Sequence, residues 1–259
     1  MIESLRANIL DCPFDRITLS QTVERCLGFC RQPRSSRTIV TVNTAGLVMM
    51  RDDEAFRQAC MDGDLVVADG VPVLWAGRLL GEPLPGRVAG VDLMAALLAA
   101  AAREGLRVYF LGAKPEIVRA LEARCKEQHP GLVVAGARDG YFDRDKSDAV
   151  IADIRGARTD ILFIGMPSPF KEVWAQAHKR ALDTPVIIGV GGSFDVLTGH
   201  VKRAPLWMQK SGLEWSWRLM MEPRKMWRRY LVGNSRFILM LLRALLQRRS
   251  RTRAGYSAP

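Results

Sequence analysis

Short apolar runs alternate with longer helical patterns along most of this chain, and this alternation constrains the fold more than any other feature. The runs are rich in β-branched and aromatic residues and read RTIVTVN, DLVVADG, LRVYFLGAK, LVVAG, TDILFIGM and TPVIIGVGG. Each is expected to be a strand, with helices between them. Strands that alternate with helices predict βαβ units. We therefore expect an α/β fold, with a mainly parallel, Rossmann-like sheet and flanking helices.

Three of the helical patterns can be bounded. The segment VDLMAALLAAAAREG is predicted to be a helix that Gly105 closes, and Pro115 marks the start of the helix in PEIVRALEARCKEQHPG. After the first run, GLVMMRDDEAFRQACMDG is interpreted as one helix that ends near Gly63. Helices of this kind serve as crossovers between parallel strands.

The organisation of the chain changes near Leu206, where the apolar runs stop and helical patterns rich in Trp and Arg follow. The formal net charge of the 259 residues is +11, and residues 200–259 alone hold 11 Arg and 3 Lys against 2 Glu. The basic character therefore belongs to the last part of the chain. We predict an α/β core over residues 1–205 and a helical, basic, membrane-associating appendage over residues 206–259.

The appendage is expected to contain one long helix over residues 223–246, opened by Pro223. At 100° per residue, this helix has a basic stripe and an apolar stripe on opposite sides. The basic stripe consists of Lys225, Arg229, Arg236 and Arg243. The apolar stripe consists of Trp227, Leu231, Ile238, Leu241 and Leu245. This pattern favours a helix on an anionic membrane surface; the alternative is packing on its own domain or on a partner subunit. We assign no core residue to residues 237–259.

Further classes of site and partner are disfavoured by what the sequence contains. The five cysteines are scattered, and Cys26 and Cys30 have no second pair that would complete a zinc site, so reduced thiols in a cytoplasmic protein are expected. The N-terminal residues hold no apolar run of signal-peptide length, and FILMLLRALL is too short to cross a bilayer. Nucleic acid is not an expected partner, because no binding motif is recognisable.

Ligands of open α/β sheets bind at the carboxyl ends of the strands, so the residues that follow each apolar run are the first candidates for a site. They are Thr41, Asn43, Asp69, Gly70, Gly112, Gly165, Gly191, Gly192 and Asp195. The glycines would let backbone N–H groups approach a phosphate or a sugar, although a plain turn is the simpler explanation for any single one. No GxGxxG fingerprint or Walker loop is present, which disfavours a dinucleotide oxidoreductase and a P-loop NTPase.

Asp69, in VVADGVPV, is the strongest single candidate for chemistry. A carboxylate directly after a buried strand can take a proton from a hydroxyl group, and burial would raise its pKa above the ordinary value of about 3.9. The alternative is that Asp69 caps the following helix. The pairs Asp62–Asp64 and Asp143–Asp145 have a spacing that some transferases use for a divalent cation, but such pairs are common, so neither a metal nor a cofactor is expected. A nucleotide diphosphate held without a metal needs guanidinium groups, which the appendage could supply.

Taken together, these stretches resemble the WecG/TagA/CpsF family of bacterial glycosyltransferases. The resemblance extends from about Thr38 to Leu246. It is carried, in the family's order, by TVNTAGLV, ADGVPVLWAGRLLG, RVAGVDLM, VYFLGAKPE, IGMPSPFKE, GVGGSFDVLTGHVKRAP and GLEWSWRLMMEPRKMWRRYLVGN. The last two stretches are the most specific. The closing run is also similar to the exopolysaccharide branch, which includes the xanthan-type glucosyltransferases.

The resemblance implies roles for individual residues. Asp69 matches the family's proposed catalytic base, and Thr41 and Asn43 match its polar pair at a strand end. Arg87 matches an arginine of the active-site pocket, and Asp195 lies in the glycine-rich nucleotide segment. The residues expected to close over the donor diphosphate are Arg218, Arg224, Lys225 and Arg228.

The resemblance also implies a reaction, an inverting and metal-independent transfer of a hexose or N-acetylhexosamine from a UDP-sugar to a polyprenyl-diphosphate-linked saccharide. The enzyme would be peripheral on the inner face of the cytoplasmic membrane, in cell-surface or exopolysaccharide biosynthesis. Family members can self-associate with the appendage displaced, so a homo-oligomer is compatible with the resemblance. Lys171 stands where the family usually has Gln, which leaves the donor open between the familiar N-acetylmannosamine and another sugar such as glucose.

An alternative function from another class remains open at this point. The chain could be a non-enzymatic nucleotide-binding α/β module whose basic tail docks a partner or nucleic acid. Asp69 would then be structural, and no UDP would be released from donor sugars.

Overall fold

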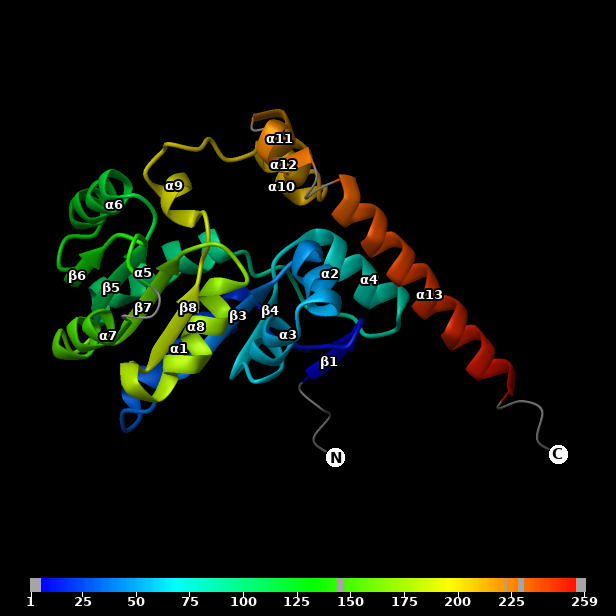
Figure 1. Cartoon of the computed structure of the whole chain (residues 1–259), viewed down its shortest axis with the longest axis horizontal. Coiled ribbons are helices and arrows are strands. Elements are labelled where there is room, and N and C mark those ends of the chain that lie inside the picture. Colours follow the sequence, from blue (N-terminus) through cyan, green and yellow to red (C-terminus); the bar gives the residue numbers. More distant parts are fainter. Residues whose placement is uncertain (1–5, 144–146, 222, 228–230, 255–259) are drawn as a thin grey trace.

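A six-stranded parallel sheet forms the centre of the molecule (Figure 1). The computed structural model describes residues 6–143, 147–221, 223–227 and 231–254. In spatial order the strands are β4 (Leu65–Ala68), β3 (Arg37–Val42), β8 (Val186–Gly189), β7 (Ile161–Gly165), β5 (Arg107–Gly112) and β6 (Val133–Arg138). All neighbouring pairs are parallel. The predicted α/β fold is confirmed, and its apolar runs suit strands that are buried on both faces.

Helices cover both faces of this sheet. One face is covered by α1 (Leu19–Arg31), α5 (Gly90–Glu104), α6 (Pro115–Gln128) and α9 (Ser193–Leu197). The other is covered by α2 (Thr44–Asp52), α3 (Glu54–Met61), α4 (Val71–Leu79), α7 (Ser147–Gly156) and α8 (Phe170–Leu182). As predicted, α6 begins at Pro115 and α5 ends at Gly105, whose φ of 66° is the left-handed value typical of such a cap.

The segment after β3 differs from its prediction, because two helices replace the single helix expected to end near Gly63. The helices α2 and α3 meet at Asp53, which has an extended backbone with φ of −127° and ψ of 104°. The Asp53 side chain accepts a hydrogen bond of 2.8 Å from the N–H of Phe56 and so caps α3. Aspartate is a good helix cap and a poor residue for a helix interior, which explains the break.

An antiparallel hairpin that the sequence analysis does not predict precedes α1. It consists of β1 (Arg6–Ile9) and β2 (Cys12–Asp15). Its turn residues Leu10 and Asp11 have positive φ angles of 54° and 67°, as a two-residue hairpin turn requires. The hairpin adds five buried side chains to the apolar cluster that also contains residues of α2 and α4, namely Ala7, Ile9, Leu10, Cys12 and Phe14. It therefore extends the core beyond the edge strand β4.

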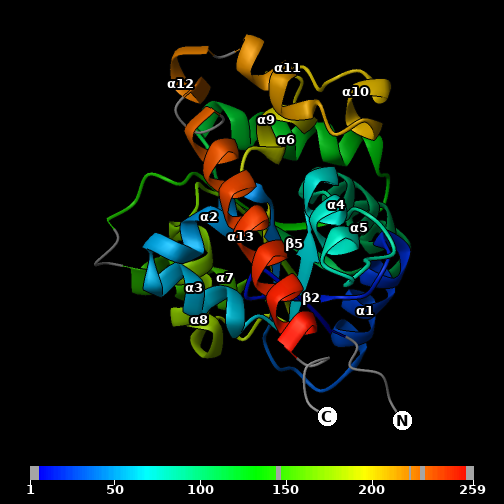
Figure 2. The same ribbon diagram turned by 90° about the vertical axis from the view of Figure 1, so that its right-hand side faces the viewer.

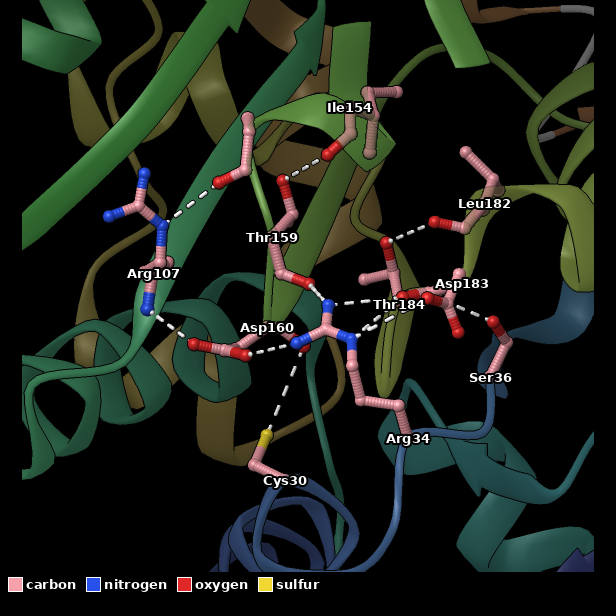
Figure 3. Close-up of polar contacts among 11 residues, drawn as sticks. Cys30, Arg34, Ser36, Arg107, Ile154, Thr159, Asp160, Leu182, Asp183 and Thr184 are labelled. Atoms are coloured by element: carbon pink, nitrogen blue, oxygen red, sulfur yellow. Dashed lines mark hydrogen bonds and ion pairs between the residues drawn. The ribbon is translucent and has the colours of Figure 1, made fainter. Parts of the chain in front are cut away.

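At the amino ends of the strands, charged side chains bond largely to backbone groups (Figure 3). Asp160, just before β7, accepts the N–H of Arg107 at 2.9 Å and a hydrogen bond from Arg34 at 3.1 Å. Arg34, in the loop between α1 and β3, also donates to the carbonyl groups of Thr159 and Asp183. These bonds join three loops that are distant in the sequence.

Beyond residue 205 the described chain is helical outside its loops, as predicted, with α10 (Leu206–Lys210), α11 (Glu214–Met221), α12 (Pro223–Trp227) and α13 (Gly233–Ala254). The first three cluster at the top of Figure 1, and α13 runs away from them along α2 (Figures 1 and 2). The predicted helix over residues 223–246 corresponds to two described helices, α12 and α13, and residues 228–230 between them lie outside the described part of the chain, so the continuity of this helix stays a prediction. Arg229 lies outside the described residues.

The helix α13 packs one face on the α/β core and exposes another. Phe237 is buried, and Met240 and Ala244 pack on the same apolar cluster as the hairpin. Arg236 binds Asp52 of α2 through two hydrogen bonds of 2.6 and 2.7 Å. The expectation that the segment beyond Arg236 adds nothing to the core is therefore wrong. The exposed large apolar residues of α13 are Ile238, Leu239, Leu242 and Leu246.

Candidate active site

A cavity of about 180 Å³ lies over the carboxyl ends of β4, β3 and β8, between the α/β core and the appendage. Its lining comes from residues that follow these strands, from the loop before α5, from the loop after α9 and from α11. It contains several sequence-predicted residues, namely Asn43, Asp69, Gly70, Arg87, Gly192 and Arg218. Side chains that are far apart in the sequence thus meet where open parallel sheets bind ligands.

Backbone bonds hold Asp69 beside this cavity. Its N–H donates to the carbonyl of Val42 at 2.9 Å, and the N–H of Gly90 donates to its Oδ2 at 3.4 Å. Asp69 does not cap α4, because the N-cap residue is Gly70, whose φ of 141° is open mainly to glycine. Burial raises the pKa of the Asp69 carboxyl, and the charge of Arg87 and the bond from Gly90 offset part of this effect. A carboxylate in this setting is suited to accept a proton.

Two arginines and two carboxylates form a network on the cavity wall. Arg203 binds Asp92 through hydrogen bonds of 2.6 and 2.8 Å, and Arg87 donates to the same carboxylate at 3.2 Å. Arg87 also donates to Glu214 of the appendage at 2.9 Å. Burial alone would raise the pKa of Asp92, but the hydrogen bonds and charges of Arg203 and Arg87 hold that pKa below its ordinary value. Asp92 is therefore ionised at neutral pH.

The appendage brings Arg218 close to the glycine-rich segment after β8. A Cβ atom on Gly192 would lie 3.1 Å from Arg218 Nη2, so the missing side chain permits the approach of this guanidinium group. The indole N–H of Trp217 donates to the carbonyl of Lys202 at 3.0 Å, which ties α11 to the loop after α9. With Arg87 and Arg203, this makes three arginines around one cavity.

The two polar residues predicted at the end of β3 occupy different places. Asn43 lines the cavity and caps α2, its Oδ1 accepting the N–H of Gly46 at 3.0 Å. Thr41 donates to the carbonyl of Gly189 on β8 at 3.3 Å and lines a separate, smaller cavity. The structure therefore brings Asn43 to the same cavity as Asp69, and places Thr41 behind the strand ends.

Lys171 lies beside Thr41 and outside the main cavity lining. It is buried on α8, forms an ion pair with Glu172, and packs its carbon chain against Gly189. A Cβ on Gly189 would lie 2.9 Å from Lys171 Cε, so the glycine makes room for the lysine. Any effect of Lys171 on the cavity therefore passes through the backbone of the segment after β8.

Gly112 and Gly165 end β5 and β7 and do not line the cavity. A Cβ on Gly112 would lie 2.6 Å from the backbone of Gly165, and a Cβ on Gly165 would lie 2.5 Å from the ring of Phe194. Close packing of neighbouring elements therefore accounts for both glycines.

The other predicted residues also lie apart from the cavity lining. Gly191, with a φ of 54°, and Asp195, in the first turn of α9, flank the lining residue Gly192 but are not part of the lining themselves. Arg224 is exposed on α12. The side chain of Lys225 and the whole of Arg228 lie outside the described part of the chain.

The sequence analysis missed three charged residues of the site: Asp92, Arg203 and Glu214. They stand inside the quoted stretches RVAGVDLM, GHVKRAP and GLEW, so a charged residue within a specific motif was the available signal. Their pairing could not be read from the sequence, because the partners are far apart in the chain and each alone resembles a solvated surface charge.

The acidic pairs considered for a metal have other surroundings. Asp62 accepts a hydrogen bond from Gln58, and Asp64 accepts the N–H of Thr38 at the amino ends of the strands, away from the cavity. Asp145 lies outside the described residues, so the second pair cannot be placed. Within the described ranges, no group of three or more His, Cys, Asp or Glu side chains is placed to hold a metal ion.

A comparison with models of protein families gives a match over most of the chain. The model described as Glycosyl transferase WecG/TagA/CpsF family matches residues 7–251. The matched range contains every residue that lines the cavity. The resemblance inferred from the sequence motifs is thereby confirmed.

Proposed function

The chain belongs to the WecG/TagA/CpsF family of glycosyltransferases, and we propose that it moves a hexose or N-acetylhexosamine from a UDP-sugar to a polyprenyl-diphosphate-linked saccharide. Family membership gives it a glycosyltransferase role in cell-surface polysaccharide synthesis. The donor, the acceptor and an inverting, metal-independent mechanism are proposed from the site. The observation that carries the proposal is Asp69, a carboxyl of raised pKa in a cavity that three arginines line.

Asp69 acts as the general base in this mechanism. It takes the proton of an acceptor hydroxyl while the hydroxyl oxygen forms a bond to the anomeric carbon of the donor sugar. The bond from that carbon to the diphosphate breaks at the same time, and UDP leaves with the electron pair. A single displacement of this kind inverts the anomeric configuration. A raised pKa suits the role, because a base works best when its pKa approaches the working pH.

Arg87, Arg203 and Arg218 neutralise the leaving diphosphate. Guanidinium groups bind phosphate oxygens through paired hydrogen bonds, and positive charge that is already in place stabilises the charge that develops on a leaving group. The Oδ1 of Asn43 already accepts the hydrogen bond that caps α2. Its amide nitrogen is therefore the group that contacts the donor. Lys171 supports the segment after β8 from behind.

The proposed reaction is tested with a panel of UDP-sugars, a polyprenyl-diphosphate saccharide and a measurement of released UDP. We expect release from a particular donor that depends on the acceptor. If no donor gives release above the donor-only control although UDP binds, the chain is instead a nucleotide-binding module without transferase activity. If UDP does not bind at all, the donor class is wrong.

The appendage is proposed to hold the enzyme on the inner face of the cytoplasmic membrane, as a peripheral protein. Among the described residues, the exposed large apolar side chains before residue 206 are Met61, Trp75, Leu79 and Tyr141, and all the others belong to the appendage. Apolar side chains that face water beside basic residues suit the interface of an anionic bilayer. None of the described helices has the length and hydropathy that crossing a bilayer requires.

Liposome flotation tests this second part of the proposal. The side chains of Leu239 and Leu242 are 53% and 51% exposed on α13, so replacing both with Ser should reduce flotation with anionic liposomes and leave the core intact. Met61→Ser on α3 is the control, because it removes an exposed apolar side chain outside the appendage. Equal flotation of the double variant and the wild type contradicts a membrane role for α13.

A further inference from the structure

Glu214, at the start of α11, lies between the two arginines that the core directs to the cavity wall. Its Oε2 accepts a hydrogen bond of 2.9 Å from Arg87, and its Oε1 lies 3.8 Å from Arg203 Nε. The Arg87 side chain is only 16% exposed, so solvent screens this contact poorly. A carboxylate of the appendage thus neutralises the same two groups that a diphosphate needs.

Asp92 contacts the same arginines but has a different place in the fold. It lies in the first turn of α5, a helix buried against the sheet, and it holds both guanidinium groups by hydrogen bonds of 2.6 to 3.2 Å. Glu214 belongs to α11, which contains no fully buried residue. A movement of the appendage can therefore carry Glu214 away, whereas Asp92 stays with the core.

Two observations indicate that the arrangement with Glu214 in place is not the one that holds a ligand. Arg203 Nε is buried and has no hydrogen-bond acceptor among the described atoms, which leaves one strong donor unused. The cavity volume of about 180 Å³ is also below the roughly 300–1,000 Å³ of typical small-molecule sites. A nucleotide sugar is larger than this volume, so we expect part of the lining to move when it binds, and α11 contributes Glu214, Trp215, Trp217 and Arg218 to that lining.

We propose that Glu214 is an internal anion that the diphosphate of the donor replaces on Arg87 and Arg203. Entry of the diphosphate breaks the contacts of Glu214 with both arginines, and phosphate oxygens take its place while Asp92 keeps both guanidinium groups oriented. The inference rests on the proposed function, because it takes a nucleoside diphosphate as the ligand. It makes Glu214 a positioning residue that sets the affinity for the donor and links donor binding to the position of α11.

The exchange predicts the direction in which affinity changes. If Glu214 occupies the arginines in the free enzyme, diphosphate binding must displace it, and the apparent affinity is reduced accordingly. Removing the charge in Glu214→Gln should therefore lower the dissociation constants of UDP and of inorganic diphosphate by about fivefold or more, the lower range of typical coupling between sites. Binding of uridine should stay unchanged, because uridine has no phosphate.

Calorimetric titration of the full chain tests this with two charge-matched controls. Glu104→Gln removes a carboxylate that pairs with Arg31 at the far end of α5, and should bind UDP as the wild type does. Asp92→Asn removes a carboxylate from the same two arginines, and should not tighten UDP binding, because Asp92 orients the arginines in both states. In turnover, Glu214→Gln should lower the KM for the donor, and Glu214→Asp should return it towards the wild-type value.

The outcomes separate this inference from the proposed function. Unchanged or weaker binding of UDP and inorganic diphosphate to Glu214→Gln overturns the exchange. An equal gain in affinity in Asp92→Asn also overturns it, because the loss of any nearby negative charge would then explain the tighter binding. Tighter binding to Glu214→Gln alone supports it, even if no UDP-sugar is turned over. In that last case the proposed transferase reaction fails while the exchange stands.

Discussion

At the amino ends of the parallel sheet, charged side chains bond mainly to backbone groups, whereas those on the cavity wall at the carboxyl ends pair mainly with one another. At the amino ends, Asp160 accepts the backbone N–H of Arg107, and Arg34 donates to two backbone carbonyls (Figure 3). Asp64 accepts the backbone N–H of Thr38. At the carboxyl ends, the ion pairs on the cavity wall join side chain to side chain, and the pair of Arg87 with Glu214 links the core to the appendage.

This difference separates stability from function within one sheet. A carboxylate that accepts a backbone N–H can be released only by opening the loop or strand that carries the donor. A carboxylate that accepts only from arginine side chains can be replaced by another anion without breaking the backbone hydrogen bonds of a strand or loop. The amino ends are therefore expected to stabilise the fold, and the carboxyl ends to exchange partners with a ligand. Matched substitutions at the two ends test this division.

The largest expected effect is the loss of turnover in Asp69→Asn. General-base catalysis typically contributes about 10²- to 10⁴-fold, so UDP release should fall by that factor while the dissociation constant of UDP changes little. The measurement is turnover with the best donor and acceptor, together with calorimetric UDP binding.

Asp160→Asn makes the same chemical change at the opposite end of the sheet and is the matched control. It should keep full turnover per folded molecule, since Asp160 is remote from the cavity. A loss below tenfold in Asp69→Asn removes Asp69 from the role of base. A large loss of turnover in Asp160→Asn would contradict the assignment of stability to the amino ends and of function to the carboxyl ends.

A smaller effect, on stability alone, is expected for Asp160→Ala. The substitution leaves the N–H of Arg107 and part of the Arg34 guanidinium group without an acceptor, and the Asp160 side chain is only 19% exposed. Both hydrogen bonds lie where solvent can reach them, so their loss should lower the free energy of unfolding by about 0.5–1.5 kcal/mol, which urea denaturation measures. Glu54→Ala is the control, because Glu54 pairs with Arg57 on the exposed face of α3 and its loss should cause no measurable change.

The central strands and the position of the site could be predicted from the sequence, because both depend on local patterns. In TDILFIGM the strand residues ILFIG are apolar since β7 is buried on both faces, and Asp69 directly follows the buried strand β4. The hairpin was not predictable in the same way. Its strands have four residues each, one contains Pro13, and their pairing depends on a turn with two positive φ angles.

The residues that escaped prediction are those whose role depends on contacts between distant segments. Arg203 follows Asp92 by more than one hundred residues, and nothing in either stretch indicates that they form a two-bond ion pair. In the sequence, Phe237 belongs to the apolar run FILMLLRALL, which has no visible partner. In the structure, Phe237 is buried against the hairpin and α2. Periodicity gives the apolar faces of a helix and does not tell which face a neighbour will cover.

The pH dependence of stability should have opposite signs at two carboxyl groups of the site. Asp69 has a pKa raised by burial, so the folded state holds its proton more tightly, and the stability from this group is lost as pH rises from the unfolded pKa through the folded one. Burial also acts on Asp92, but hydrogen bonds from Arg203 and Arg87 lower its pKa overall. Its stability is present above the unfolded pKa and lost as pH falls through the folded one.

Asp69→Asn should therefore be more stable than the wild type at pH 7, and Asp92→Asn less stable. The difference for Asp69→Asn should shrink as pH falls towards about 4, near the pKa of an unfolded Asp, and the difference for Asp92→Asn should shrink only as pH falls further below that value. Urea denaturation of both variants at a series of pH values gives the two slopes. Slopes of the same sign would mean that the two carboxyl groups do not sit in the contrasting environments described.

The smallest expected effect is that of EDTA, which should leave turnover unchanged. At the amino ends, Asp64 is engaged by the N–H of Thr38 and by Lys179, so its oxygens are committed to donors. At the carboxyl ends, Asp92 is engaged by two arginines. A divalent cation prefers several oxygen ligands, and binding one here would first require these contacts to break.

The guanidinium groups can instead neutralise the diphosphate themselves. Turnover of dialysed enzyme should thus be the same with EDTA as with added Mg²⁺ or Mn²⁺. Loss on chelation that Mg²⁺ or Mn²⁺ restores would show that the arginines do not suffice, and that one of the carboxylates gives up its N–H donors during the reaction.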